Sequence, residues 1–110
     1  MITFGEIKAY KEPDKTGLYI RGHADYAKGD DIVCAAVSAI GQTAAKGCKC
    51  YDRKTEIRQH KKGHIVFVCY KTAESIAIIN AALLGLNAIK LQYPQCFTKD
   101  CMTDTRKVDE

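Results

Sequence analysis

Residues 22–38 read GHADYAKGDDIVCAAVS, and this stretch joins the end of a predicted strand to the start of a predicted helix. The loop between the two is polar and has a glycine at either side, Gly22 and Gly29. Asp31 has the side chain of a helix N-cap, and apolar and small residues continue after it. The stretch therefore predicts a strand, a short loop and a buried helix, in that order.

A histidine and a cysteine flank this loop in a way that suits nucleophilic catalysis. With Asp31 as the N-cap, Cys34 falls in the first helical turn, where unpaired backbone N–H groups and the helix dipole stabilise a thiolate. The thiolate is the reactive form of cysteine. His23 stands at the strand end, so the fold can bring its imidazole to the sulfur as a general base. His23 and Cys34 are therefore the predicted catalytic residues.

Neighbouring residues are predicted to support this pair, namely Gly22, Asp31 and Ser38. Ser38 follows Cys34 by four positions and shares its helix face, so the hydroxyl can reach toward the sulfur or the loop. Asp31 either caps the helix or competes with Asp25 and Asp30 to orient the imidazole. Capping explains Asp31 more economically, and we assign no catalytic triad.

The loop over residues 24–29 has two interpretations. The glycines on either side of it allow hinge torsions, so the segment could close over the site as a lid, although short polar loops are also ordinary connectors. The backbone N–H groups at the helix start, including that of Cys34, are the nearest candidate donors for an oxyanion hole.

Length and composition indicate one globular domain. The chain has 110 residues, of which 46% are hydrophobic and 27% charged, so neither disorder nor a fibrous class is indicated. Its 17 basic and 13 acidic residues leave a net charge of +4, which is mild for a nucleic-acid-binding protein. We therefore expect a protein partner rather than nucleic acid.

The sequence also predicts the compartment. We find no apolar run long enough to cross a bilayer, and residues 1–6 lack the basic and apolar regions of a signal peptide. We therefore expect a cytoplasmic protein without membrane contact. In a reducing compartment, its six cysteines would serve as core thiols, metal ligands or catalytic groups rather than as a disulfide framework.

Periodicity along the chain predicts two strands, a helix, two further strands and a second helix. This order, ββαββα, predicts the α+β class: a small antiparallel four-stranded sheet with two helices. The predicted segments are a strand over 2–9 with a bulge near Gly5, a turn over 11–17, a strand over 18–23, a helix over 32–45 that stops at Gly47, a strand over 48–58, a turn over 59–63, a central strand over 64–70, and a helix over 73–91 capped by Thr72. We expect a single domain over 1–93 and a loosely held polar tail over 94–110.

Alternation in the second strand predicts where the site lies. Leu18 and Ile20 share one face of this strand, and Tyr19, Arg21 and His23 share the other. The apolar pair is expected to face the core. His23 is then expected to point to the opposite face, so the active site is predicted on that side of the strand end.

Two other residue clusters suggest further functions but are better explained as structural. Six residues could contribute to a zinc site, namely Cys48, Cys50, His60, His64, Cys96 and Cys101. Their spacing lacks paired Cys-x-x-Cys knuckles, so no metal is predicted. A basic hairpin contains Arg53, Lys54, Arg58, Lys61 and Lys62, which could contact RNA but are more typical of a solvated edge that prevents sheet pairing.

Residues 22–24, GHA, and 31–39, DIVCAAVSA, resemble the signature of the ribosomal-processing cysteine proteases, the Prp family of bacteria and their phages. The resemblance implies a ββαββα fold, usually dimeric, with His23 and Cys34 as the catalytic dyad and no cofactor. Asp31 and Ser38 also match family positions.

The resemblance further implies a substrate. Members of the family remove a short N-terminal extension from a large-subunit ribosomal protein, cutting after an aromatic pair, and phage relatives are thought to process capsid or scaffold proteins. The sequence thus predicts a cysteine endopeptidase acting on such a protein partner. The alternative is a non-enzymatic RNA- or ribosome-binding module that uses the basic hairpin.

Overall fold

The computed structural model describes residues 4–22, 31–61, 64–98 and 101 of the chain. Its elements are β1 (Phe4–Lys11), β2 (Lys15–Gly22), α1 (Asp31–Tyr51), β3 (Glu56–Lys61), β4 (His64–Tyr70), α2 (Ala73–Gln92) and the short 3-10 helix η1 (Pro94–Cys96). The order of strands and helices is ββαββα, which confirms the α+β prediction.

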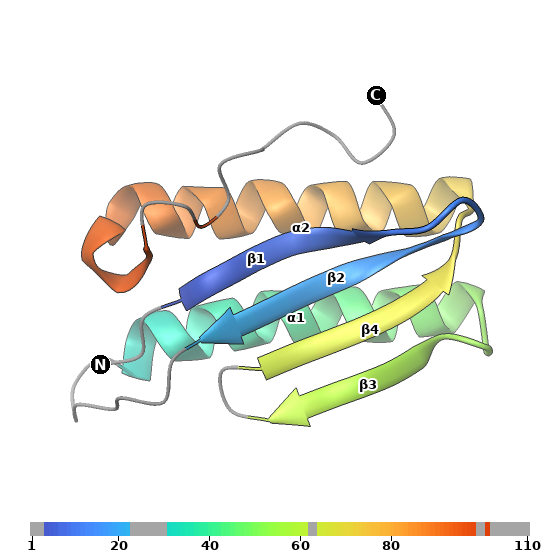
Figure 1. Cartoon of the computed structure of the whole chain (residues 1–110), viewed down its shortest axis with the longest axis horizontal. Helices are drawn as coiled ribbons and strands as arrows, with labels where there is room; N and C mark the ends of the chain where they lie inside the picture. Colours follow the sequence, from blue (N-terminus) through green and yellow to red (C-terminus); the bar gives the residue numbers. More distant parts are fainter. Residues whose placement is uncertain (1–3, 23–30, 62–63, 99–100, 102–110) are drawn as a thin grey trace.

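The four strands form one antiparallel sheet in the order β1-β2-β4-β3. Both helices lie against the same face of this sheet, and the opposite face is turned toward the viewer in Figure 1. Helix α1 contacts β4 and β2, whereas α2 contacts β2 and β1. Side chains between the two layers form the core, which includes Leu18, Ile20, Val37, Phe67, Ile79 and Leu86.

The inner strands show the central position of β4 and the alternation of β2 that the sequence predicts. Strand β4 lies between β2 and β3, as its apolar content on both faces indicates. In β2, Leu18 and Ile20 are buried in the core, whereas Tyr19 and Arg21 are only partly buried on the other face. At the sheet edge, the register of β1 shifts between Phe4 and Glu6, which confirms the bulge near Gly5.

The first hairpin turn is shorter than predicted, because β2 begins at Lys15 and includes Gly17. A Cβ atom at Gly17 would lie 2.0 Å from the carbonyl oxygen of Phe67 in β4. This glycine is therefore required by the close approach of the neighbouring strand rather than by a turn. A single sequence does not reveal that approach.

Helix α1 corrects two predictions. It continues to Tyr51 instead of stopping at Gly47, so residues 48–51 are helical and the next strand begins only at Glu56. A Cβ atom at Gly47 would lie 3.4 Å from Cδ1 of Ile78 in α2. Gly47 thus lies where the two helices pack against each other, and this packing outweighs its low helix propensity.

The start of α2 confirms the predicted cap. The Ser75 amide donates to Oγ1 of Thr72 at 3.0 Å, and the Thr72 amide donates to Oγ of Ser75 at 2.9 Å, so the two residues form a capping box. By length and by a window hydropathy of 1.4, α2 is long and apolar enough to cross a membrane, which corrects the expectation that no segment is. In this fold, its buried residues Ile79, Leu83 and Leu86 belong to the core over the sheet.

The chain after Tyr93 packs against the start of β1. Phe97 forms a parallel bridge with Phe4, with ring centroids 5.5 Å apart, and the Thr98 amide donates to the Phe4 carbonyl at 3.0 Å. Cys96 and Cys101 are buried. The expectation of a loosely held chain is therefore wrong for residues 94–98, because the Cys96 and Phe97 side chains complete the core at this edge.

Candidate active site

The predicted site lies where β2 ends and α1 begins, and Figure 1 places both at the same end of the molecule. Gly22 is the last residue of β2, is buried and pairs with Phe4 of β1. Asp31 is the first helical residue of α1 rather than the residue before it, so Cys34 is the fourth. The sulfur is thus carried close to the helix start, as predicted.

Cys34 points from α1 into the core. Its exposed fraction is 5%, and it belongs to the same buried cluster as Val33 and Val37. A helix that is packed along its length gives the sulfur a fixed position, which favours nucleophilic catalysis. All six cysteines lie in the described part of the chain and are reduced thiols, and Cys34 differs from the other five in lying at a helix start.

Ser38 lies one turn after Cys34 and is partly buried. The structure therefore brings Gly22, Cys34 and Ser38 to the same end of the fold, on two elements that are in contact. Of Asp31, the structure describes the backbone and its helical position only.

The predicted base, His23, lies outside the described residues, as do Asp25, Asp30 and the candidate lid 24–29. The contact between His23 and Cys34 therefore stays a prediction. Strand alternation would place residue 23 on the face of Tyr19 and Arg21. Because β2 ends at Gly22, this alternation no longer fixes the direction of the next side chain.

Arg21 adds a group that the sequence analysis did not single out as functional. Its guanidinium lies over the Tyr19 ring, 4.8 Å from the centroid, and Lys8 approaches the same ring at 5.2 Å. The Nε of Arg21 is buried and has no hydrogen-bond partner in the described part of the chain. Although Arg21 directly precedes Gly22, its side chain lies with Tyr19 on the sheet face opposite the helices, so this donor is on the other side of the sheet from Cys34.

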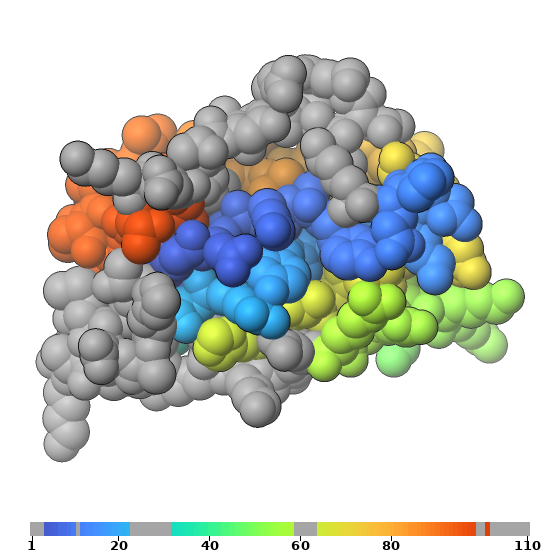
Figure 2. Space-filling view, viewed as in Figure 1, coloured from blue at the N-terminus to red at the C-terminus, as the bar shows by residue number. Residues whose placement is uncertain are grey.

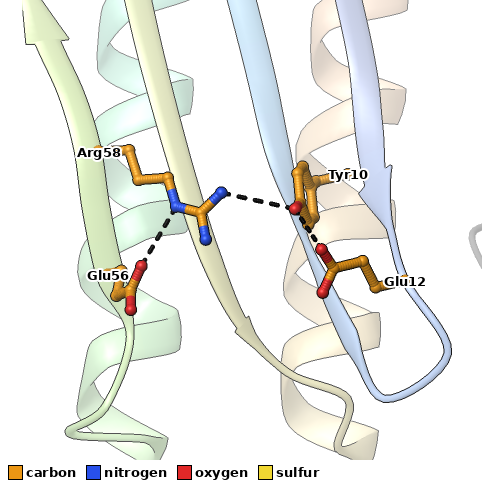
Figure 3. Close-up of polar contacts among 4 residues, drawn as sticks. All are labelled: Tyr10, Glu12, Glu56 and Arg58. Carbon is orange, nitrogen blue, oxygen red and sulfur yellow. Dashed lines mark hydrogen bonds and ion pairs between the residues drawn. The ribbon is translucent and has the colours of Figure 1, made fainter.

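The structure shows neither a metal cluster at the candidate zinc ligands that it describes nor an unpaired Arg58 in the basic hairpin. Among the side chains that the structure describes, which do not include that of His60, no three His, Cys, Asp or Glu side chains gather so that they could hold a metal ion. Arg58 of the basic hairpin donates to Glu56 at 3.2 Å and to the Tyr10 hydroxyl at 3.4 Å, and that hydroxyl donates to Glu12 at 2.5 Å (Figure 3). The hydrogen bonds to Tyr10 and Glu56 raise the pKa of Arg58 above its ordinary value. One of the five basic residues of the hairpin is thus paired with a carboxylate on the same strand.

The fold and the cysteine position define a class: a small α+β protein with a buried thiol at a helix start. Comparison with known proteins identifies the family. The family model described as cysteine protease Prp matches residues 1–98, so the chain belongs to the Prp family and is a cysteine protease. Among curated proteins, none matches the chain.

Two solved structures share the fold, both of the essential ribosomal processing protease Prp from S. aureus. One holds a covalently linked product peptide and the other a substrate peptide. Each superposes with a TM-score of 0.63 at 23% sequence identity, and the match covers 92% of this chain and 99% of the other. The fold therefore extends over nearly the whole of both chains.

Proposed function

We propose that this protease removes a short N-terminal extension from a large-subunit ribosomal protein, with Cys34 as nucleophile and His23 as general base. The observation that carries the proposal is the position of Cys34, a buried thiol close to the start of α1, next to the strand end that precedes His23. The family match over residues 1–98 includes both. The S. aureus relatives, named as ribosomal processing proteases, support the substrate class.

The proposed reaction proceeds through an acyl-enzyme. His23 takes the proton from Cys34 Sγ, and the thiolate attacks the scissile carbonyl carbon. The C–N bond breaks as His23 returns the proton to the leaving amine, which is the new N-terminus of the mature protein. His23 then takes a proton from water, the hydroxide attacks the thioester, and the N-terminal fragment leaves as a carboxylic acid while the thiol is restored.

The start of α1 also provides for the negative charge that develops on the substrate carbonyl. Backbone N–H groups in a first helical turn have no partners within the helix, and the helix dipole adds positive potential there. Such donors stabilise a tetrahedral oxyanion when they point to its position. Because α1 begins at Asp31, the amides beside Cys34 are the candidate donors.

We also propose the compartment and the oligomeric state: the protease acts in the cytoplasm as a homodimer. Reduced thiols at all six cysteines suit a cytoplasmic enzyme. The family resemblance supports a homodimer, and the sheet face opposite the helices, part of which Figure 2 shows, is not covered by α1 or α2. A phage-borne member would act on a capsid or scaffold protein through the same chemistry.

A cleavage assay with matched variants tests the proposal. The substrate is a peptide with an aromatic-pair site, and the variants are Cys34→Ala and His23→Ala, with Cys50→Ala as a control for an exposed cysteine elsewhere. We expect no cleavage from the first two and unchanged cleavage from the control, with circular dichroism showing a folded chain in each. Full activity of Cys34→Ala would refute the proposed nucleophile. Salt-dependent RNA binding that responds to Arg58→Ala, without peptide cleavage by the wild type, would favour the binding-module alternative.

A further inference from the structure

Helix α2 has an apolar side that the sheet does not cover. Six of its exposed side chains are apolar, namely Ala73, Ala77, Ala81, Leu84, Ala88 and Leu91. They recur every three or four residues, so they form one stripe along the helix, and the other exposed residues, Glu74 and Gln92, lie near its two ends. Leu84 is 64% exposed and Leu91 is 75% exposed. The outer side of a solvated helix is ordinarily polar, so this stripe has the composition of a surface that another surface covers.

Helix α1 continues this apolar surface. Its exposed side chains over the first two thirds of the helix are Ile32, Ala35, Ala39 and Thr43. They also recur every three or four residues, and α1 lies beside α2 against the same face of the sheet (Figure 1). Among the described side chains of α1, the charged ones are Lys46 and Lys49, close to its end. We call the two stripes together the outer helix face.

A groove of about 470 Å³ runs between α1 and α2 on this face. Apolar or small residues of both helices line it, including Ala39, Ile40, Thr43, Gly47, Ile78 and Ala81. Leu84 lies one turn beyond Ala81 and is mostly exposed. One copy of the chain therefore offers both a projecting leucine and a groove of small side chains, which is the self-complementarity that a two-fold interface requires.

We propose that a second copy of this chain covers the outer helix face, so that the homodimer forms helix against helix about a two-fold axis. The available area supports this occupant. Helices of 21 and 20 residues are each about 30 Å long, and side by side they present a face roughly 20 Å wide. That is about 600 Å² per copy, or about 1,200 Å² for the pair, which reaches the range of stable specific interfaces.

The opposite side of the molecule suits pairing less well. On the open sheet face, Lys8 and Arg21 both lie over the Tyr19 ring, 5.2 Å and 4.8 Å from its centroid. Lys8 also forms an ion pair with Glu6 at 3.3 Å. Burying this face would remove water from charged groups, which costs free energy that new contacts must offset. The outer helix face has no such cost over most of its length.

The buried side of α2 argues against a membrane as the occupant. Ile79 and Leu86 are 0% exposed and belong to the core over the sheet. If α2 left the sheet to cross a bilayer, core residues such as Leu18 and Phe67 would lose their cover. A helix that lies on a membrane surface carries bulky apolar residues beside lysine or arginine, whereas four of the six residues in the α2 stripe are alanine.

Pairing through this face would also affect the proposed active site. Ile32 belongs to the outer helix face, is 66% exposed and precedes Cys34 by two residues in α1. Covering Ile32 would hold the first turn of α1 in place, and a fixed nucleophile favours catalysis. The inference rests on the homodimer of the proposed function and names the face through which it forms. It requires neither the catalytic pair nor the ribosomal substrate.

Analytical ultracentrifugation of the full chain and matched variants tests the inference. Leu84→Lys and Ala81→Lys each place a charge on the outer helix face, at positions that are exposed in the single chain. Tyr70→Lys is the control, because Tyr70 is 42% exposed and pairs in the sheet with Lys15, whose ammonium lies over its ring. We expect two-chain particles for the wild type and the control. In both helix variants, the dissociation constant should rise at least about tenfold, and circular dichroism should show a folded chain.

The possible outcomes separate this inference from the rest of the proposed function. A dimer that neither helix variant weakens would overturn the inference and leave the homodimer, and weakening by Tyr70→Lys would place the interface on the sheet. A wild type that stays monomeric at the highest attainable concentration, yet cleaves peptide, would overturn the inference and leave the catalytic pair. A monomer that floats with vesicles of phosphatidylglycerol and phosphatidylcholine would assign the face to a membrane instead.

Discussion

The carboxylate of Asp52 accepts a hydrogen bond from the backbone amide of Tyr70 at 3.3 Å. Its other oxygen accepts a hydrogen bond from the Lys54 amide at 2.9 Å. These two contacts hold the turn after α1 against the end of β4. The contact connects parts of the chain that the sequence alone does not bring together.

Asp52→Ala is expected to lower the free energy of unfolding by about 1 kcal/mol, because it removes the acceptor of two backbone amides. Asp14→Ala is the matched control, since the Asp14 side chain is exposed and its recorded contact with the Lys71 amide is made by the backbone carbonyl. Urea unfolding of both variants measures the difference. Equal stability of the two would show that the Asp52 contacts contribute nothing.

The capping box at α2 gives a second prediction. Thr72→Ala removes the acceptor of the Ser75 amide and should cost about 1 kcal/mol of stability, whereas Thr72→Ser keeps an oxygen there and should cost much less. Thermal unfolding of the two variants compares them directly. A Thr72→Ser variant as unstable as Thr72→Ala would rule out the hydroxyl as the source of the effect.

Two glycines should respond to alanine in opposite directions. Gly17→Ala would place a Cβ atom 2.0 Å from the Phe67 carbonyl oxygen, so β2 and β4 must separate locally, at a cost of at least about 2 kcal/mol. Gly47→Ala would place its Cβ at 3.4 Å from Ile78, and the gain in helix propensity should leave stability unchanged or up to about 1 kcal/mol higher. Chemical denaturation measures both, and a destabilised Gly47→Ala would mean that α1 and α2 pack more tightly than this contact indicates.

Much of the fold follows from local sequence signals. Strand β4 is a run of β-branched and aromatic residues, and α2 begins with a capping residue before apolar residues at helical spacing, so both elements were predictable. The position of Cys34 was predictable to within one residue, because an aspartate followed by a run of apolar and small residues marks a helix start in sequence, although Asp31 is the first helical residue rather than the cap. These features depend only on neighbouring residues.

The errors arise at contacts between residues far apart in the chain. Gly47 resembles a helix stop until Ile78 is placed against it, and Gly17 resembles a turn residue until Phe67 is placed against it. Ending the helix at Gly47 placed residues 48–51 in a strand, although they are the last residues of α1. The packing of Phe97 on Phe4 escaped prediction in the same way, since the surrounding segment is polar.

The central claim, that Cys34 is the nucleophile, is tested most directly by mapping a covalent adduct. A peptidyl chloromethyl ketone that ends in an aromatic pair is incubated with the full chain, and the modified residue is found by mass spectrometry of the digest. We expect one adduct per chain, on Cys34, with loss of peptide cleavage in proportion to labelling. An inactivated enzyme whose adduct lies on another residue, with Cys34 unmodified, would contradict it.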